Sequence, residues 1–182
     1  MLARVRPRSI RTMCVVRQAE PRDAEAAVEL VRRSITQSCT ADHRDDADTL
    51  GTWLANKTSQ NFVSWLANDD KFCVIAEANA QLQGVGLVHR SGEIRLFYLV
   101  PEAQRQGIGR AIHGALEAKA TEWSLPELTL DSTLSARSFY EALGYRSTGA
   151  AKPRFGVLQS FPYAKTLRPA DDRNIAVASS IA

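Results

Sequence analysis

The chain has 182 residues, of which 45% are hydrophobic and 24% are charged. This is the profile of one globular domain, and it excludes a disordered, collagen-like or membrane-embedded chain. The formal net charge of +3 originates in the first dozen residues, which hold four arginines and no acid. Without those four, 19 of the 23 basic residues remain against 20 acidic ones, a balance that gives no support for nucleic-acid binding.

The cysteines and histidines show no metal-site or disulfide pattern. Cys14, Cys39 and Cys73 are far apart with no C-x-x-C pair, and the three histidines lack the spacing of metal ligands. No apolar run approaches the ~18 residues that cross a bilayer, and the N-terminus lacks the hydrophobic core of a signal peptide. These features predict a cytoplasmic protein with no metal and no membrane partner.

Both ends of the chain are expected to lie outside the folded domain. Residues 1–12 are rich in arginine, which loosely resembles a transit peptide. However, Met13 can serve as a second start, and the periodic pattern begins just after it. We therefore expect a disordered or misassigned leader over 1–12, a single domain over 13–168 and a flexible tail over 169–182.

The first part of the domain is predicted to be a strand followed by helices. Residues 15–18 form the strand. The helix after it has an apolar stripe at helical spacing, made of Ala24, Ala27, Val28, Val31 and Ile35. The polar, acidic segment 38–48 is predicted to be a loop. Two short helices follow over 50–54 and 62–66, the second with Ser59 as its cap.

The middle of the chain changes to strand character. Three apolar runs, over 72–76, 83–89 and 93–100, are joined by turns near Asn79 and Gly92. Short strands connected by tight turns pair with their neighbours in sequence. The pattern therefore predicts an antiparallel meander.

Helices and strands alternate in the last part of the domain. We expect a helix over 107–121, a strand over 128–130, a helix over 136–143 and a last strand over 157–165. Gly144 is expected to end the second helix, because glycine is the usual residue just past a helix end. Pro162 is expected to break the last strand. Since no repeat or low-complexity linker is present, we expect one α/β domain.

The segment 100–111 is suited to binding an anion. A strand ends there, a short loop follows, and a helix begins at Gly107 and Gly109. Glycines let a ligand approach the backbone, and the unpaired N–H groups at a helix start face it. Arg105 and Arg110 add positive charge, which favours a pyrophosphate. The pattern is neither a P-loop nor a complete dinucleotide fingerprint, and tight packing at a helix start would explain the glycines equally well.

Two motifs resemble landmarks of the GCN5-related N-acetyltransferase (GNAT) superfamily. Segment 104–109, QRQGIG, matches the signature Q/R-x-x-G-x-G/A, and segment 136–145, ARSFYEALGY, resembles A-x-x-F-Y-x-x-x-G-F/Y. The predicted elements follow the family's order over about 15–167. The resemblance implies a mixed, mainly antiparallel central sheet flanked by helices, with acetyl-CoA as co-substrate and no metal.

The resemblance also implies which residues hold acetyl-CoA. The pyrophosphate would be bound by the backbone of Gln104, Arg105, Gln106, Gly107, Ile108, Gly109, Arg110 and Ala111. The pantetheine arm would pair like an extra strand with Leu99 and Val100, although core packing is an alternative role for Leu99. Thr133 lies near the start of the second motif, where the family often has asparagine, so a hydroxyl replaces that amide.

Two catalytic roles follow from the same resemblance. Tyr140 stands where many members place a general acid that protonates the leaving thiolate; the alternative is an aromatic side chain packed in the core beside Phe139. Glu93, fourteen positions before Gly107, resembles the catalytic glutamate of the histone acetyltransferase branch. Glu93 is therefore predicted to take the proton from the acceptor amine, with a solvated strand-end glutamate as the alternative.

The region 24–66 shapes the acceptor site in this family. It contains an acidic run made of Asp42, Asp45, Asp46 and Asp48. Such a run suits a cationic amine such as a polyamine or an aminoglycoside, but a solvated loop with helix caps would explain it too. Cys39 and Cys73 are predicted to be buried and inert rather than nucleophilic.

Together these features predict direct transfer of an acetyl group from acetyl-CoA to a primary amine of a small-molecule or peptide acceptor. No nucleic acid or membrane partner is expected, and a homodimer is common in the family. A non-catalytic acyl-CoA-binding sensor or assembly domain is the alternative. An enzyme acting on charged tRNA is disfavoured by the near-neutral body of the chain. The residue types at Tyr140 and Glu93 favour the enzyme, whose acceptor stays open.

Overall fold

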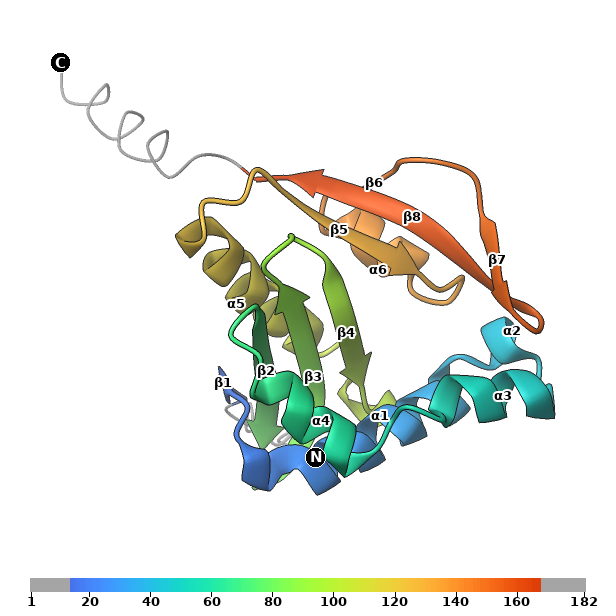
Figure 1. Ribbon diagram of the computed structural model, residues 1–182, viewed down its shortest axis with the longest axis horizontal. Coiled ribbons are helices and arrows are strands. Elements are labelled where there is room, and N and C mark those ends of the chain that lie inside the picture. Colours follow the sequence, from blue (N-terminus) through green and yellow to red (C-terminus); the bar gives the residue numbers. More distant parts are fainter. Residues whose placement is uncertain (1–13, 168–182) are drawn as a thin grey trace, which may run out of the picture.

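The computed structural model describes residues 14–167, which form two antiparallel sheets (Figure 1). The predicted leader over 1–12 and tail over 169–182 lie outside the described residues. The first sheet has the order β1-β2-β3-β4, made of β1 (Val15–Gln18), β2 (Lys71–Ala78), β3 (Gln81–His89) and β4 (Ile94–Leu99). The predicted meander is confirmed, and β1 joins it at the edge of β2.

The second sheet is built around one long strand. β8 (Leu158–Thr166) pairs with β5 (Glu127–Ser132), β6 (Arg146–Ser147) and β7 (Lys152–Phe155). The predicted break at Pro162 is wrong, because Pro162 keeps its place opposite Asp131 and its carbonyl accepts the N–H of Thr148 at 3.0 Å. The sequence analysis missed β6 and β7, which are short, mostly exposed and without apolar alternation.

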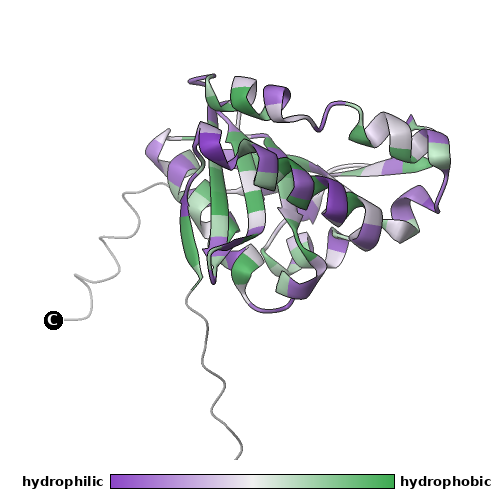
Figure 2. Ribbon diagram, turned by 90° about the horizontal axis from the view of Figure 1, so that it is seen from below, coloured by the Kyte–Doolittle hydropathy of each residue, from purple (hydrophilic) through white to green (hydrophobic). Residues whose placement is uncertain are grey.

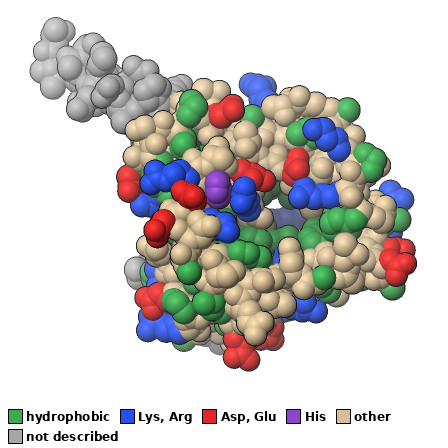
Figure 3. Space-filling view, in the orientation of Figure 1, with side chains coloured by type: hydrophobic (Ala, Val, Ile, Leu, Met, Phe, Trp, Pro, Cys, Tyr) green, Lys and Arg blue, Asp and Glu red, His purple; other side chains and the backbone are tan. Residues whose placement is uncertain are grey.

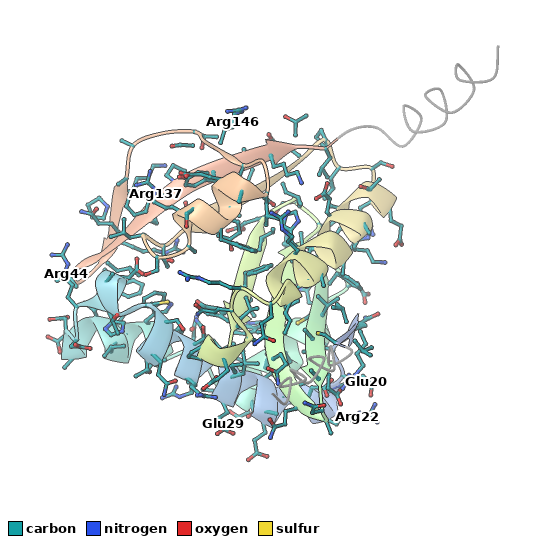
Figure 4. The ribbon with its side chains drawn as sticks, turned by 180° about the vertical axis from the view of Figure 1, so that it is seen from behind. Glu20, Arg22, Glu29, Arg44, Arg137 and Arg146 are labelled. Carbon is teal, nitrogen blue, oxygen red and sulfur yellow. The ribbon has the colours of Figure 1, made fainter. Side chains whose placement is uncertain are left out.

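Helices cover both faces of the first sheet. α1 (Ala24–Ser38) and α4 (Ser59–Leu66) pack on one face, whereas α5 (Ile108–Glu122) and α6 (Arg137–Ala142) lie on the opposite side, toward the viewer in Figure 4. In Figure 2 the strands of this sheet are largely hydrophobic, and the helices carry most of the hydrophilic residues. The predicted stripe of α1 is confirmed, with Ala27 and Ile35 completely buried.

The segment 38–48 differs from the predicted loop. It contains α2 (Thr40–His43) and the start of α3 (Ala47–Leu54). Its acidic residues support this local structure, since Asp46 caps α3 by accepting the N–H of Thr49 at 2.8 Å. Polarity in this segment therefore reflects helix ends rather than an extended loop.

Two further helix ends can be compared with the sequence. α4 is capped by Thr58, whose hydroxyl accepts the N–H of Asn61 at 3.2 Å, rather than by Ser59, which is already the first helical residue. Gly144 follows α6 with a φ of +91°, a left-handed conformation that glycine adopts readily. The predicted role of Gly144 is confirmed.

The two sheets meet only at one end of β4 and β5. The Thr129 N–H donates to the Gly92 carbonyl at 2.9 Å, and Glu93 forms an isolated parallel bridge with Thr129. A Cβ at position 92 would lie 2.6 Å from the Glu127 carbonyl oxygen, so glycine permits this close approach. Beyond this contact the strands diverge and leave a splay between the sheets (Figure 1), which contains the candidate site.

Across residues 14–167, no helix is both long enough and apolar enough to cross a membrane. Within the same range, no group of three or more His, Cys, Asp or Glu residues is placed to hold a metal ion.

Candidate active site

A cavity of about 570 Å³ occupies the splay. Its wall combines residues of β4, of the end of β5, of the loop before α5, and of α1 and α6. Figure 3 shows the molecule hollowed between the two sheets, with hydrophobic and basic side chains around the hollow. The strand divergence therefore creates a cavity that reaches from the start of α5 to the open edge of β4.

The start of α5 forms one end of this cavity. Gly107 is the N-cap residue with a φ of +84°, and no side chain caps the helix. The first N–H groups of a helix have no partner within it, so these amides are free to bind an anion. Arg105 and Arg110 also lie in the wall, as do Gln104 and Gly109. The loop thus brings backbone donors and two cations to one place.

Other residues of the predicted pyrophosphate loop have different surroundings. Ile108 is buried in the core, and neither Gln106 nor Ala111 lies in the cavity wall. The Gln106 side chain donates to the Glu102 carbonyl at 2.6 Å, which holds the loop in its turn. None of these three residues therefore lines the cavity, and the Ala111 N–H already donates to the Gly107 carbonyl at 3.1 Å.

The end of β4 presents an unpaired edge to the cavity. The Val100 N–H donates to the Gln83 carbonyl of β3 at 3.0 Å. Because successive amides of a strand point to opposite edges, the Leu99 amide points away from β3, toward the splay. Leu99 lies in the cavity wall, whereas Val100 is buried outside it. Of the two predicted contacts, the structure brings Leu99 to the cavity.

Tyr140 lies at the far side of the cavity on α6. Its side chain is 6% exposed and packs edge-on against the rings of Phe97, Phe139 and Tyr145. Burial, with a smaller contribution from Tyr98, raises the pKa of the Tyr140 phenol well above its usual range. Among the described residues, no side-chain hydrogen bond involves its hydroxyl. The structure therefore holds a protonated phenol in the wall.

A buried polar contact between His113 and Tyr145 lies next to Tyr140. His113 of α5 lies 3.0 Å from the Tyr145 hydroxyl through Nε2. Burial, together with the charge of Lys165, lowers the pKa of His113 to about 4. His113 is therefore neutral at neutral pH. Its ring packs against Tyr145, which in turn packs against Tyr140.

Glu93 lies just before β4, outside the walls of both cavities described here. Its carboxylate accepts a hydrogen bond from Arg95 Nε at 2.7 Å, and the side chain is 44% exposed. Asp131, which the sequence analysis did not single out, lies in the walls of both cavities and pairs with Arg154 at 2.9 Å. In the sequence, Asp131 is distinguished only as a polar residue that follows the apolar Leu130.

The acidic run does not face the cavity. Asp42 is buried and accepts the N–H of Leu134 at 2.6 Å and that of Ser135 at 3.3 Å, which ties α2 to the segment before α6. Asp46 caps α3, and hydrogen bonds from Thr49 lower its pKa. No residue of the run lines either described cavity. These contacts favour the helix-cap interpretation.

The two internal cysteines are thiols rather than thiolates. Cys39 lines the cavity and Cys73 lies in β2, and both are buried. Burial raises the pKa of each to about 12. Since the thiolate is the nucleophilic form of cysteine, neither residue is activated for attack.

The fold and a comparison with protein-family models identify the class of protein. A family model, described as "Acetyltransferase (GNAT) domain", matches residues 39–167, and the chain belongs to this family. A comparison with curated proteins found no match. Solved structures similar to this chain have low sequence identity to it, so their likeness shows the fold alone.

A GCN5-related N-acetyltransferase from Rhodopseudomonas palustris, whose description also reads "Aminotransferase, Class-II", is 21% identical at a TM-score of 0.74, covering 84% of this chain and 95% of that one. The PaiA N-acetyltransferase from Thermoplasma acidophilum, solved with coenzyme A, is 18% identical at 0.72, covering 85% and 99%. The ribosomal-protein-S18-alanine N-acetyltransferase from Escherichia coli is 17% identical at 0.65, covering 87% and 96%.

Proposed function

We propose that the protein transfers an acetyl group from acetyl-CoA directly to a primary amine. One observation carries the proposal: a single cavity joins an uncapped helix start, flanked by Arg105 and Arg110, to the buried phenol of Tyr140. The first feature suits a pyrophosphate and the second suits a leaving thiolate. Their presence in one cavity wall is what a ligand with a phosphate at one end and a reactive sulfur at the other requires.

The wall residues fit acyl-CoA as follows. The amides at the start of α5 and the two arginines would bind the pyrophosphate. The edge of β4 at Leu99 would accept the pantetheine arm as an extra strand, and Thr133, which lies in the wall, would offer its hydroxyl. When bound, acetyl-CoA supplies an activated acetyl thioester.

The reaction forms a bond between the acceptor nitrogen and the acetyl carbon and breaks the bond from that carbon to sulfur. The Leu99 amide would stabilise the negative charge that develops on the carbonyl oxygen. Tyr140 donates its phenolic proton to the departing sulfur. An ammonium cannot attack, so a carboxylate must first remove a proton from the acceptor.

Two carboxylates compete for the role of base. Glu93 is the residue predicted from the sequence, but its side chain lies outside both walls and pairs with Arg95. Asp131 lies in the wall shared by the two cavities. We therefore assign the direct proton transfer to Asp131 and keep Glu93 as a base that would act through water.

The alternative function is a non-catalytic acyl-CoA sensor or assembly domain, which would need the pyrophosphate site but no buried phenol. The test uses purified protein, calorimetric titration with acetyl-CoA, and thiol release in the presence of an amine panel. We expect binding together with amine-dependent thiol release. Binding without thiol release for any amine would favour the sensor.

A further inference from the structure

A second, smaller cavity of about 210 Å³ lies beside the first. The two share the side chains at their junction, including Arg95, Tyr98 and Asp131. The rest of the second wall comes from α3, from the segment after it, and from the β7–β8 hairpin. A molecule in this cavity would thus meet the site of acetyl transfer from the side opposite α5.

The floor of the second cavity is held firmly by aromatic side chains. Trp53 of α3 is buried and donates through Nε1 to the Tyr98 hydroxyl at 3.3 Å. Its ring packs edge-on against Phe155, with the ring centroids 6.5 Å apart. The hairpin is also fastened to α3, because the Val157 N–H donates to Thr49 Oγ1 at 3.1 Å. The cavity is therefore formed by three segments that contact one another.

The charged residues of this wall are mostly cationic. Lys57, Arg95 and Arg154 face one acid, Asp131. Arg154 already pairs with Asp131 at 2.9 Å, and Arg95 contacts Glu93 only through Nε. The wall therefore has an excess of positive charge and guanidinium N–H groups suited to a planar carboxylate.

Among these three cations, Lys57 is the one without a carboxylate partner in residues 14–167. It is half-buried, and within residues 14–167 its side-chain contact is with the Asn56 amide oxygen rather than with a carboxylate. Burial and the charge of Arg154 lower the pKa of Lys57 to about 8. A nearby anion would offset both effects, so this position favours a negatively charged ligand group.

We propose that the second cavity is the acceptor subsite and selects small amines that carry a carboxylate. This inference rests on the proposed acetyl transfer. Lys57, Arg95 and Arg154 bind the acceptor's carboxylate, while Asp131 faces its amino group at the junction with the first cavity. The acidic run, which suggested a cationic acceptor, is engaged in helix caps and segment contacts instead.

The test compares amines that differ only in the carboxylate. Glycine, β-alanine and lysine are each paired with their amides, and spermidine represents a polyamine. We expect a KM at least about tenfold lower for a carboxylate form than for its amide, given the strength of charge-assisted hydrogen bonds. Equal or better use of the amides, or of spermidine, would overturn the proposal.

Substitutions in the wall of the second cavity test which side chains produce the preference for a carboxylate. Lys57→Gln and Arg154→Gln are expected to bring the two KM values together, chiefly by raising that of the carboxylate form. Lys57→Arg should keep the preference. Lys152→Gln removes an exposed charge of the same hairpin that lies outside the cavity and should leave it unchanged. A preference that survives Lys57→Gln and Arg154→Gln would contradict the assignment.

A binding measurement separates this inference from the proposed function. Calorimetric titration of the same amine pairs into the protein saturated with coenzyme A needs no turnover. Carboxylate-selective binding that depends on Lys57, without acetylation of any amine, would support the subsite and refute the transferase. Acetylation without carboxylate selectivity would support the transferase and refute the subsite.

Discussion

The two cavities of the splay offer different kinds of chemical group to a ligand. The first offers backbone amides at the start of α5, where Gly107 forms the turn, and the open strand edge of β4 at Leu99. The second offers side chains from three separate segments, among them Lys57 and Arg154. Backbone groups are the same in every residue, so the first wall can serve a common co-substrate. The second wall can change its specificity through single substitutions.

This contrast predicts different sensitivity to mutation. Substitutions in the first wall should affect every acceptor alike, whereas substitutions in the second should affect one acceptor class more than another. The following variants test that difference, beginning with the largest expected effect.

Tyr140→Phe should lower kcat about 10³-fold, because a general acid typically contributes 10²–10⁴-fold. The ring still fills its place among Phe97, Phe139 and Tyr145, so the Kd for acetyl-CoA should stay the same. The control is Tyr145→Phe, which removes only the contact with His113 and should leave kcat nearly unchanged. Unchanged turnover in Tyr140→Phe would remove the phenol from the mechanism.

Asp131→Asn should lower kcat/KM about 10²-fold, since the base would be lost. The comparison is Glu93→Gln, which alters a half-exposed carboxylate outside both walls and should change kcat/KM less than about fivefold. The reverse ranking of the two variants would assign the base to Glu93.

Gly107→Val should weaken acetyl-CoA binding by roughly 5- to 30-fold. The φ of +84° at this position costs an L-residue about 1–2 kcal/mol, and each 1.4 kcal/mol is tenfold in affinity. Gly114→Val, an exposed site on the same helix with open space around it, is the matched control. If both variants bind acetyl-CoA like the wild type, the helix start is not the pyrophosphate site.

The smallest effect on activity is expected at His113, which supports the first wall from behind. Its folded-state pKa of about 4 lies below the ordinary histidine pKa of 6.5, so between these pH values the unfolded chain binds a proton that the folded chain does not bind. The stabilisation is full above pH 6.5 and is lost as the pH falls toward 4, by about 3 kcal/mol in total.

Denaturant unfolding of the wild type and of His113→Gln at pH 7 and pH 4.5 measures this loss. The wild type should lose more unfolding free energy than the variant between the two conditions. An equal loss in both proteins would show that other groups govern the acid sensitivity.

Local patterns predicted the meander and the helices well. Apolar spacing identified α1 and α5, because each helix buries one face. Continuous apolar runs identified β2 and β3, because helices cover both faces of their sheet. The failures have local causes. β7 is polar and exposed, and Pro162 is accommodated in β8 because its carbonyl remains bonded.

The first wall was also predictable, since the start of α5 and Tyr140 lie within two continuous motifs. The second wall was not. Lys57, Asp131 and Arg154 come from segments far apart in the chain, and only the divergence of β4 from β5 brings them to one cavity. No spacing rule connects such residues, so the second cavity is recognised only in three dimensions.

The most direct test of the central claim follows the acetyl group itself. Stoichiometric protein is mixed with acetyl-CoA and an amine, and mass spectrometry measures acetylation of the amine and of the protein over time. Direct transfer predicts acetyl on the amine and none on the protein, Cys39 included. No acetylated amine, or an acetyl-protein that forms first and then decays into product, would contradict the account.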